Sequence, residues 1–409
     1  MRILVLSQFY PPEPITRLRD LVSYLKQQGH QVSVLTTFPS YPLGQIYDTY
    51  QLKWRKFDWE ADIPITRVFA WPYRGMNQIK RFLSYISFAI AALLFDLLPR
   101  LISRNHPELL YIYHPPLTTG LAGTIYALLA KVPVIYDVQD LWPDAIVAAG
   151  LLRSDSKIYR SLRRAEIFVY RHAKHITVLS DGMKENLMQK GVPANKISII
   201  SNWGDPTISQ PQDVSDFRQQ KGWDGRFVIL LAGNIGMTHG LHTVIEAADL
   251  LRRDPSILFV FLGSGAALPE LKTMAQTKKL DNVCFCPQVS QHEATKYINS
   301  ADVTLVHLKA EAGGDFSVPH RIFSYMLCGK AIIAATSGST ANLIETYQCG
   351  WTCPPSKPDM LAHIIMIAQS HPEACAAFGK NGIVAANTEF SRSHLLAKIE
   401  QILRTVIDG

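Results

Sequence analysis

The 409-residue sequence lacks the short signatures of several large enzyme classes. It contains no Asp-x-Asp pair, no G-x-S-x-G segment, no G-x-x-x-x-G-K-[ST] loop and no H-E-x-x-H segment. The last three signatures are typical of α/β-hydrolases, P-loop nucleoside triphosphatases and zinc proteases, respectively. No motif therefore places the chain in any of those classes.

Cysteine is missing from the N-terminal half. All six cysteines lie between residues 284 and 375, and none of them forms a C-x-x-C pair. This spacing favours neither a disulfide framework nor a zinc site, and reduced thiols are typical of the cytoplasm. The N-terminal run M-R-I-L-V-L-S-Q-F-Y lacks the cleavage site of a signal peptide and predicts a first strand. We therefore expect a cytoplasmic protein.

A dinucleotide-binding fingerprint is missing as well. Such a fingerprint needs three small residues in phase directly after a strand. The predicted first strand leads into S-Q-F-Y-P-P-E, which has no glycine, and the G-S-G segment at 263–265 is followed by Leu268 where the third small residue would stand. We expect no nicotinamide cofactor.

Basic residues outnumber acidic ones, which gives a net charge of +7 and a pI near 9.0. This balance suits an anionic membrane surface, a nucleotide-bearing substrate or a nucleic acid. The aromatic interleaving of a nucleic-acid groove is missing, so nucleic acid ranks last among these partners. A hydrophobic fraction of 47% indicates a globular protein with large cores.

Short apolar runs, typical of strands, alternate along the chain with segments whose apolar residues recur at helical spacing. This alternation predicts mostly parallel, doubly wound α/β sheets with ligands at the carboxyl ends of the strands. The predicted strands are residues 3–6, 31–35, 65–70, 109–113, 132–137, 176–179 and 197–200, followed by 228–232, 257–262, 283–285, 303–306, 331–335 and 350–353.

The pattern pauses in a polar stretch around residues 203–224 and then restarts, which predicts two such domains. We place the first domain at 1–204, the linker at 205–225 and the second domain at 226–388. An amphipathic segment at 393–406 has no strand after it. We expect residues 389–409 to return to the first domain as a C-terminal helix.

Two stretches of the first domain suggest a surface partner. Residues 82–95 carry no charge, but they are too few to span a bilayer, which needs about 20 residues. They form either a buried core helix or a helix that enters a membrane interface. Arg153, Lys157, Arg160 and Arg164 follow one stripe of one predicted helix, which is either a solvated face or a contact for anionic headgroups.

Residues 317–333, S-V-P-H-R-I-F-S-Y-M-L-C-G-K-A-I-I, predict a loop, a buried helix and a strand. The Val318-Pro319 pair favours an extended entry, and Gly329 ends the helix. Arg321 stands in the first turn, where a phosphate group would dock. The alternative is an ordinary helix-to-strand turn with a surface arginine.

Glycines follow the first two predicted strands of the second domain, in L-A-G-N-I-G-M-T-H-G-L at 231–241 and L-G-S-G-A-A-L at 262–268. Glycine allows a ligand to approach the backbone closely. Without an Asp-x-Asp pair to hold a cation, phosphate charge must be met by side chains and backbone. The best candidates are Arg321, His239 and the Gly233-Asn234 backbone.

Several segments together resemble the retaining family-4 glycosyltransferases, closest to the branch that builds O-antigen, capsule and related surface polysaccharides and includes amino-sugar transferases. These segments run in the family's order through essentially the whole chain. They are Pro11-Pro12-Glu13, T-F-P-S-Y-P-L-G at 37–44, D-L-W-P-D at 140–144, V-L-S at 178–180, G-N-I-G at 233–236, G-S-G at 263–265 and V-P through G-K at 318–330.

The resemblance implies the GT-B fold of two facing Rossmann-like domains. It implies that the second domain binds a nucleoside diphosphate sugar, commonly a UDP-sugar, and that the first binds the acceptor. Transfer would retain the anomeric configuration without a metal, because the leaving β-phosphate can accept the acceptor's proton. The donor-binding residues it implies are Gly233, Asn234, His239, Gly263, Ser264, Gly265, Gln288, Val289, Ser317, Arg321 and Ser324.

Three residues are the catalytic candidates on the acceptor side. Many members of the family place a histidine after the fourth strand, a position that falls on Tyr113 or His114. We expect His114 to be a positioning group or an acid/base. Asp140 follows the fifth strand, where its alternative role is to cap the next helix. Glu13, after the first strand, is the third candidate.

The sequence departs from the family pattern at several of these positions. Asn234 and His239 stand where the family usually has an arginine and a lysine. Phe316 and Ser324 stand where it has a pair of glutamates, the second of which binds ribose. Pro11, Pro12, Glu13 and Pro14 replace its first glycine-rich loop.

The sequence thus predicts a metal-independent hexosyl- or N-acetylhexosaminyltransferase that needs no cofactor. Its expected partners are a nucleotide-sugar donor, a lipid-linked or glycan acceptor and the anionic inner face of the cell membrane. Two alternatives stay open at this point. One is a nucleotide-sugar 2-epimerase on the same fold, and the other is a non-catalytic partner in a polysaccharide assembly complex.

Overall fold

The structure is a computed structural model that describes residues 1–73, 75, 77–103, 106–148, 150, 152–205, 208, 213–309, 316 and 318–408. The chain forms two compact units. Unit 1 contains residues 1–179, 183–200 and the C-terminal helix from residue 396 onward. Unit 2 contains residues 180–182 and 201–395. Each unit is built around one sheet.

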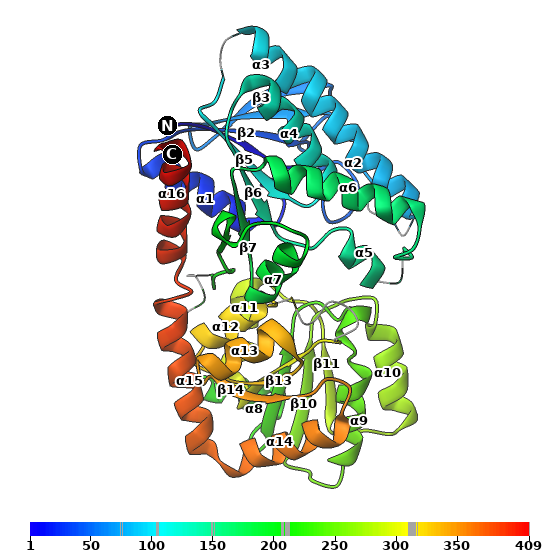
Figure 1. Cartoon of the computed structure of the whole chain (residues 1–409). Helices are drawn as coiled ribbons and strands as arrows, with labels where there is room; N and C mark the ends of the chain where they lie inside the picture. Colours follow the sequence, from blue (N-terminus) through cyan, green and yellow to red (C-terminus); the bar gives the residue numbers. More distant parts are fainter. Residues whose placement is uncertain are drawn as a thin grey trace. The chain divides into compact units, whose positions relative to one another are not determined.

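Unit 1 contains an eight-stranded sheet in the order β3-β4-β2-β1-β5-β6-β7-β8 (Figure 1). Its strands are β1 (Arg2–Leu6), β2 (Gln31–Thr37), β3 (Arg55–Glu60), β4 (Ile63–Val68), β5 (Leu109–His114), β6 (Val134–Val138), β7 (His175–Val178) and β8 (Ile197–Ile199). Neighbouring strands are parallel except for β3, which pairs antiparallel with β4. The mostly parallel sheet that the sequence predicts is confirmed.

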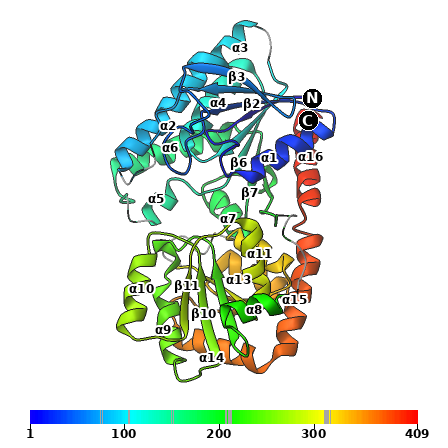
Figure 2. The same ribbon diagram turned by 180° about the vertical axis from the view of Figure 1, so that it is seen from behind.

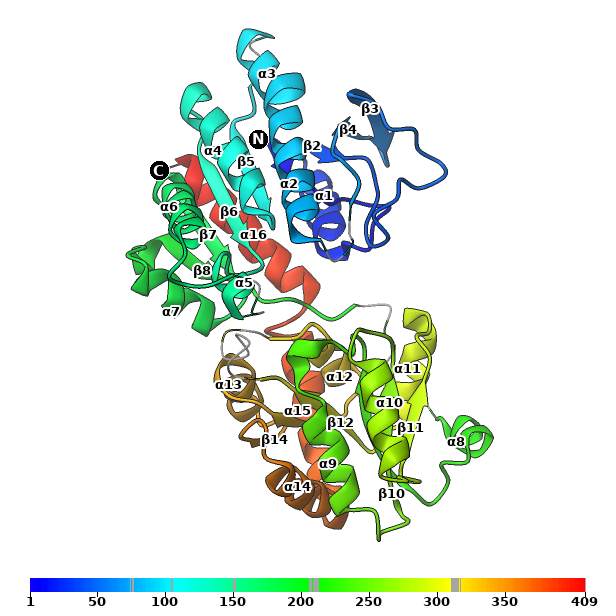
Figure 3. The same cartoon turned by 90° about the vertical axis from the view of Figure 1, so that its right-hand side faces the viewer.

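Helices cover both faces of this sheet. One face carries α2 (Gln78–Ala92), α4 (Leu117–Ala130) and α6 (Lys157–His172), which lie side by side in Figure 3. The other carries α1 (Thr16–Gln27) and α16 (Arg392–Asp408), which the view from behind in Figure 2 shows. The remaining helices of this part are α3 (Leu98–Ser103), α5 (Asp144–Ala148), α7 (Asp181–Gln189), a π-helical turn at Leu93–Leu97 and a 3₁₀ turn at Ala194–Lys196.

The return of the C-terminal helix to the first domain is confirmed from Leu396 onward, whereas residues 389–395 belong to unit 2. Glu400 of α16 accepts a hydrogen bond from the Tyr24 hydroxyl at 3.0 Å and lies 3.2 Å from Nε2 of His30. The apolar side of α16 is buried at Leu396, Ile399 and Leu403 in the same unit. Apolar burial and a polar anchor therefore both attach this helix to unit 1.

One strand of unit 1 was missed. In β3 the sequence R-K-F-D-W-E leaves most side chains exposed, including Phe57 at 55% and Trp59 at 64%. Sequence reasoning looks for apolar runs, which mark strands buried on both faces. An exposed edge strand carries no such run, so β3 gives no signal of that kind.

Residues 82–95 form a helix that is partly buried and partly exposed, so the core role is confirmed for one side and the membrane role stays a prediction. Tyr85, Phe88 and Ala92 are buried against the unit, whereas Phe82 and Leu94 are 41% and 56% exposed. The continuous helix Gln78–Ser103 is the single described helix that is long and apolar enough to cross a membrane, by length and composition. Its most apolar window has a mean hydropathy of 1.9 and is 39% buried, as in a core helix with an apolar outer side.

The basic stripe is shorter than predicted. Ser156 caps α6 by accepting a hydrogen bond from the Tyr159 N–H, so the helix begins at Lys157. Arg153 lies before the cap and pairs with Asp155 at 2.8 Å. The helical stripe therefore starts at Lys157, because a capping serine ends the helix in the N-terminal direction.

Unit 2 contains a six-stranded sheet in the order β11-β10-β9-β12-β13-β14. Its strands are β9 (Phe227–Ala232), β10 (Ile257–Leu262), β11 (Val283–Cys286), β12 (Val303–His307), β13 (Ala331–Ala335) and β14 (Gly350–Cys353), all parallel. Its helices are α8 (Ser215–Lys221), α9 (His242–Leu250), α10 (Leu268–Thr277), α11 (Gln291–Ser300), α12 (Arg321–Leu327), α13 (Gly338–Thr346), α14 (Pro358–Ser370) and α15 (Pro372–Asn387), with a 3₁₀ turn at Met237–His239.

Both faces of the second sheet are buried. Along β9, Val228 and Leu230 belong to one hydrophobic cluster, and Ile229 and Leu231 belong to another. Alternate residues of a strand point to opposite faces, so each cluster packs on one side. This explains why the strands of unit 2 read as continuous apolar runs.

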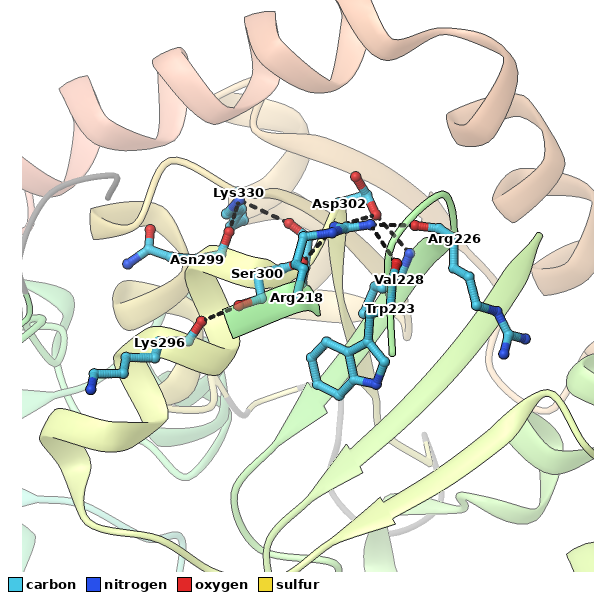
Figure 4. A network of polar contacts seen from close by, with 10 residues as sticks. Arg218, Trp223, Arg226, Val228, Lys296, Asn299, Ser300, Asp302 and Lys330 are labelled. Carbon is cyan, nitrogen blue, oxygen red and sulfur yellow. Dashed lines mark hydrogen bonds and ion pairs between the residues drawn. The ribbon is translucent and has the colours of Figure 1, made fainter. Parts of the chain in front are cut away.

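Unit 2 resumes at Ser201, so it contains residues 201–204 and the described part of the predicted linker. Trp223 is 3% exposed in one of the two cores. Arg218 of α8 donates to the carbonyl oxygen of Ser300 at 2.7 Å and to Asp302 at 3.1 Å (Figure 4). The carboxylate of Asp302 also accepts from the Val228 N–H at 2.7 Å. Residues 213–225 are therefore a packed entrance to the sheet, because Trp223 and Arg218 both attach to it.

Candidate functional site

The first part of the candidate site lies where the second sheet changes direction. The connections from β9 run outward through β10 to β11, whereas β12, on the other side of β9, leads to β13 and β14. Ligands of doubly wound folds bind outside the carboxyl ends of the strands at such a switch point. Gly233 follows β9 there, and His307 is the last residue of β12.

Arg321 points at the loop after β9. The backbone of Gly233 has a φ of +115°, and a Cβ atom at that position would lie 3.7 Å from the guanidinium carbon of Arg321. The Nη2 atom of Arg321 donates to the carbonyl oxygen of Asn234 at 3.3 Å and lies 3.5 Å from Nδ1 of His239. Three of the predicted donor-binding positions are thus brought around one guanidinium group.

The charge of Arg321 is not neutralised within the described part of the chain. No carboxylate of those residues lies within ion-pair distance of its guanidinium. By contrast, Arg218 at the other end of the sheet pairs with Asp302 and donates to a backbone carbonyl. Arg226 there also donates to a backbone carbonyl. The side chain is partly accessible to solvent. A partly exposed arginine that no described carboxylate neutralises is able to bind an anion.

His239 is neutral in this setting. Burial, and then the neighbouring charge of Arg321, lower the pKa of His239 to about 4. Its position is set by His307, whose Nδ1–H donates to the carbonyl oxygen of His239 at 2.6 Å. Nε2 of His307 accepts from the Ser356 N–H at 3.3 Å. Both ring nitrogens of His307 therefore stabilise loops around the site.

Sequence reasoning missed His307. The residue is 2% exposed and ends the apolar run V-T-L-V-H. A polar residue at the carboxyl end of a buried strand was the signal that could have found it. Tyr325 was missed as well, and its hydroxyl accepts from the Ala232 N–H at 2.9 Å, which fixes α12 to the end of β9.

The two glycine-rich loops interlock. A side chain at Gly263 would collide with the carbonyl oxygen of Gly233, and one at Gly265 would collide with the carbonyl oxygen of Ile235. The Ile235 N–H donates to the carbonyl oxygen of Ser264 at 2.9 Å. These glycines are thus required for loop packing as well as for any approach of a ligand.

The loops after β10 and β11 share a polar contact at the carboxyl edge of the sheet. The Ser264 hydroxyl donates to Oε1 of Gln288 at 2.6 Å, and both residues are exposed. Val289 is partly buried against the core of unit 2. Ser324 lies one helical turn after Arg321 and is partly exposed. Ser317 lies outside the described residues.

The predicted end of α12 is confirmed. Gly329 has a φ of +65°, and its N–H donates to the carbonyl oxygen of Met326 at 2.9 Å. The Lys330 N–H donates to the carbonyl oxygen of Tyr325 at 3.1 Å. A left-handed glycine directly after a helix is a common C-terminal cap.

In unit 1 the contacts of Glu13 favour a structural role over the catalytic role expected of it. This side chain is 1% exposed, and its carboxylate accepts hydrogen bonds from the backbone N–H groups of Tyr10, Ser40 and Tyr41 at 3.2, 2.7 and 2.8 Å. A buried carboxylate satisfied by backbone donors is poorly placed to accept a substrate proton. Glu13 instead connects the loops after β1 and β2.

His114 is a buried neutral group. It is 2% exposed, and its ring packs 5.6 Å from that of Tyr136 and 6.4 Å from that of Trp142. Burial, followed by the charge of Lys190, lowers its pKa to about 3. An acid/base group should titrate near the working pH. Its burial and its lowered pKa together favour the positioning role for His114 over the acid/base role.

Asp140 keeps its carboxylate accessible. The residue is exposed, and it makes no hydrogen bond or ion pair through its side chain with the described residues. The surrounding protein nevertheless displaces enough water to raise the pKa of Asp140 to about 6. The capping alternative is not observed, because α5 begins at Asp144. Asp140 is thus an available carboxylate with a perturbed pKa.

A buried network beside Asp140 was missed. Asp137 of β6 is 1% exposed and accepts hydrogen bonds from Tyr111 and Thr177 at 2.8 Å each. Arg17 lies 3.6 Å from the same carboxylate and donates to the carbonyl oxygen of Ile200 at 3.1 Å. This network ties the carboxyl ends of four strands together. An aspartate inside the apolar run V-I-Y-D-V was the available signal.

In the ranges that the structure describes, no cluster of three or more His, Cys, Asp or Glu side chains is arranged to hold a metal ion. Metal independence itself stays a prediction.

Two doubly wound domains, with polar residues at the carboxyl ends of their strands, agree with the GT-B class of glycosyltransferases. A search of solved structures agrees with this fold. The chain is similar to HepE from Anabaena, crystallised in complex with UDP, with a TM-score of 0.73 and 18% identity over 99% of this chain and 100% of HepE.

The two halves also match glycosyltransferase families. Residues 14–203 match the family described as Glycosyl transferase 4-like domain, and residues 213–384 match Glycosyl transferases group 1. The chain therefore belongs to the glycosyltransferases that combine these two domains.

Curated relatives agree with the family assignment. The chain is 29% identical over 359 residues to the putative colanic acid biosynthesis glycosyl transferase WcaI of Escherichia coli (strain K12), which covers 85% of this chain and 86% of WcaI. It is 28% identical over 297 residues to the probable glycosyltransferase WbjE of Pseudomonas aeruginosa, which covers 71% of each chain.

Proposed function

We propose that this protein is a retaining glycosyltransferase that moves a hexosyl or N-acetylhexosaminyl group from a UDP-sugar to a lipid-linked glycan or polysaccharide acceptor. The reaction would need no metal. It would take place on the cytoplasmic face of the cell membrane, to which the protein binds peripherally. Unit 2 would bind the donor, and unit 1 would bind the acceptor.

One observation carries the donor part of this proposal. The guanidinium of Arg321 stands at the switch point of unit 2, beside Gly233 and His239, without a carboxylate partner among the described residues. A diphosphate supplies the bidentate negative charge that such a group binds. UDP is the favoured nucleotide because the solved relative HepE was crystallised with UDP.

The residues around Arg321 would stabilise the leaving group. As the bond between the sugar and the β-phosphate breaks, negative charge grows on the phosphate oxygens, and a fixed guanidinium favours that charge more than it favours the bound donor. A neutral His239 can donate or accept one hydrogen bond without competing for the charge. His307 would keep His239 in place.

Asp140 would act on the acceptor. An ionised carboxylate at this position can accept a hydrogen bond from the sugar hydroxyl that attacks and can orient it. The β-phosphate of the leaving diphosphate would receive the hydroxyl proton, so Asp140 need not become protonated. The buried network of Asp137, Tyr111 and Arg17 would fix the strand ends from which Asp140 projects.

The names of the curated relatives favour a surface polysaccharide. WcaI is named for colanic acid biosynthesis, and WcaI matches along most of its length. A lipid-linked acceptor agrees with the apolar side chains that unit 1 exposes. Phe82 of α2, Leu94 of the adjoining π-helical turn and Leu129 of α4 are 41%, 56% and 59% exposed.

Helices α2, α4 and α6 also expose no acidic side chain. Their acidic residues, with those of the adjoining π-turn and α3, are Asp96 and Glu166, which are 0% and 1% exposed. Asp96 pairs with Arg55 and Arg100, and Glu166 pairs with Lys190. Exposed apolar groups mixed with unopposed basic groups favour an anionic membrane surface.

A donor titration and a turnover assay test the proposal. Calorimetry with UDP, GDP and dTDP should show the tightest binding for UDP. A panel of UDP-sugars with lipid extract as acceptor should release UDP and form a product of retained configuration by NMR. Interconversion of two sugar nucleotides without acceptor would favour the epimerase instead. Absence of binding by any nucleotide would overturn the donor site and favour a non-catalytic partner.

A further inference from the structure

Unit 1 contains a basic cavity far from the residues considered so far. It lies at the amino ends of β6, β7 and β8, whereas Asp140 follows the carboxyl end of β6. The cavity has a volume of about 760 Å³ and lies between the C-terminal ends of α4 and α6 and the segment before β8. Its ionisable lining side chains are Lys131, Arg171, His172, Lys174 and Lys196, and no acidic residue is among its described lining.

Most of this positive charge is unopposed. Lys196 donates to the carbonyl oxygens of Tyr170 and Arg171 at 2.8 Å each, which closes the C-terminal end of α6. Lys131, Arg171 and Lys174 are exposed, and no carboxylate of the described residues lies within ion-pair distance of them. Because Lys196 satisfies the helix carbonyls, the other cations are available to an anion.

The position of Lys131 is fixed by its backbone. It follows α4 with a φ of +55°, and its N–H donates to the carbonyl oxygen of Ala127. Glycine is the favoured residue at this left-handed position, because it has no side chain to strain the turn. The chain instead presents a lysine side chain at the edge of the cavity.

The wall next to these cations is apolar. Leu128 of α4 lines the cavity and is 48% exposed, and its neighbours Ile125 and Leu129 are 41% and 59% exposed. A soluble phosphate or nucleotide would leave these aliphatic groups in water. An amphiphile would bring an anion to the cations and acyl chains to the leucines.

We propose that this cavity is a binding site for the phosphoryl headgroup of an anionic phospholipid, separate from the acceptor site. The inference rests on the proposed membrane association and assigns it a specific contact. A lipid bound there would attach α4 and α6 to the bilayer while the carboxyl edge of the same sheet remains free to bind the acceptor. Lys131, Arg171 and Lys174 would bind the phosphate oxygens, and Leu128 and Leu129 would face the acyl chains.

Vesicle binding tests this site. A variant that combines Lys131→Ala, Arg171→Ala and Lys174→Ala should bind vesicles of phosphatidylcholine and phosphatidylglycerol about 100-fold more weakly at low salt, since each basic residue near an anionic surface contributes about five-fold. The matched control combines Lys296→Ala, Lys357→Ala and Lys380→Ala. These residues are exposed in unit 2, so the control has the same net charge. Its vesicle binding should stay within about two-fold of the wild type, because its lysines lie outside the cavity.

Each other outcome has a definite meaning. Equal weakening of both variants would overturn the site, because net charge alone would explain the binding. Calorimetric binding of inorganic phosphate that the cavity variant abolishes, together with vesicle binding that Leu129→Gln leaves unchanged, would show a soluble anion and overturn the lipid assignment. Wild-type protein that ignores the anionic vesicles would overturn the membrane part of the proposed function as well. UDP affinity, measured on the same samples, tests the donor site separately.

Discussion

The Nδ1–H group of His307 donates to the carbonyl oxygen of His239 at 2.6 Å, across 68 positions of the sequence. This bond joins the end of β12 to the loop after β9, and Ser356 donates to the other nitrogen of the same ring. Nδ1 of His239 lies 3.5 Å from Nη2 of Arg321. The position of the guanidinium therefore depends on His307, which acts on it through His239.

His307→Ala should therefore weaken UDP binding. The substitution removes the bonds that hold the backbone of His239 and Ser356, and we expect affinity to fall about ten-fold, or about 1.4 kcal/mol. Calorimetry measures this change. His363→Ala, an exposed histidine in α14, is the control and should bind UDP normally. If His307→Ala also bound UDP normally, His307 would have no role in positioning the site.

Arg321→Ala should reduce UDP affinity by about 1.5–3 kcal/mol, the scale of a hydrogen bond to a charged group. Arg321→Lys should recover part of the loss, because lysine keeps the charge but not the planar fork. Both variants should melt close to the wild type, since the guanidinium is partly exposed. Undiminished affinity in the alanine variant would remove Arg321 from the donor site.

Asp140→Asn should lower turnover and change its pH dependence. The raised pKa, about 6, means that the wild-type rate should fall as the pH drops through 6, when the carboxylate takes up a proton. The asparagine variant should lose this acid limb while its UDP affinity stays near that of the wild type. A rate equal to the wild type at pH 7 would exclude Asp140 from the reaction.

The same residue should show a cost in stability. A folded pKa above the unfolded value of about 3.9 means that the unfolded chain binds fewer protons between pH 4 and 6, so Asp140 destabilises the fold as the pH rises through that window. Asp140→Asn should then raise the melting temperature at pH 7. A lower melting temperature would indicate that the ionised carboxylate stabilises the fold.

His114 should contribute to acid lability. Its folded pKa of about 3 lies below the unfolded value of about 6.5, so the stability it provides is complete above pH 6.5 and is lost as the pH falls toward 3. His114→Gln should destabilise the protein at pH 7.5 through packing. Its further loss between pH 7.5 and 5, measured by urea unfolding, should be smaller than that of the wild type. Parallel pH profiles would show that His114 titrates normally.

The substitution Glu13→Gln distinguishes a structural role of Glu13 from a catalytic role. The substitution leaves one oxygen for the backbone donors of Tyr10, Ser40 and Tyr41, and we expect a loss of about 2 kcal/mol of unfolding free energy. UDP affinity should not change, because this loop belongs to unit 1. Wild-type stability combined with abolished turnover would restore the catalytic role that the sequence predicts.

Features that depend on neighbouring residues could be predicted from the sequence, whereas features that depend on residues distant in sequence could not. The buried strands, the C-terminal helix and the end of α12 at Gly329 were readable because they depend on local periodicity and on one backbone conformation. The edge strand β3 was not readable, because an exposed strand needs no apolar run. The linker was drawn too long because Trp223 is buried by residues distant in sequence, such as Tyr297.

The sequence by itself determined the two α/β domains, the glycine-rich loops at Gly233 and Gly263 and the family to which they point. Only the tertiary structure decided what each polar residue does. In the fold, Glu13 connects two loops and His114 is buried. Asp140 stays accessible, and His307 holds the backbone of His239. The physical reason is that a side chain's role depends on its partners and its hydration, and the fold brings those partners from other strands and loops.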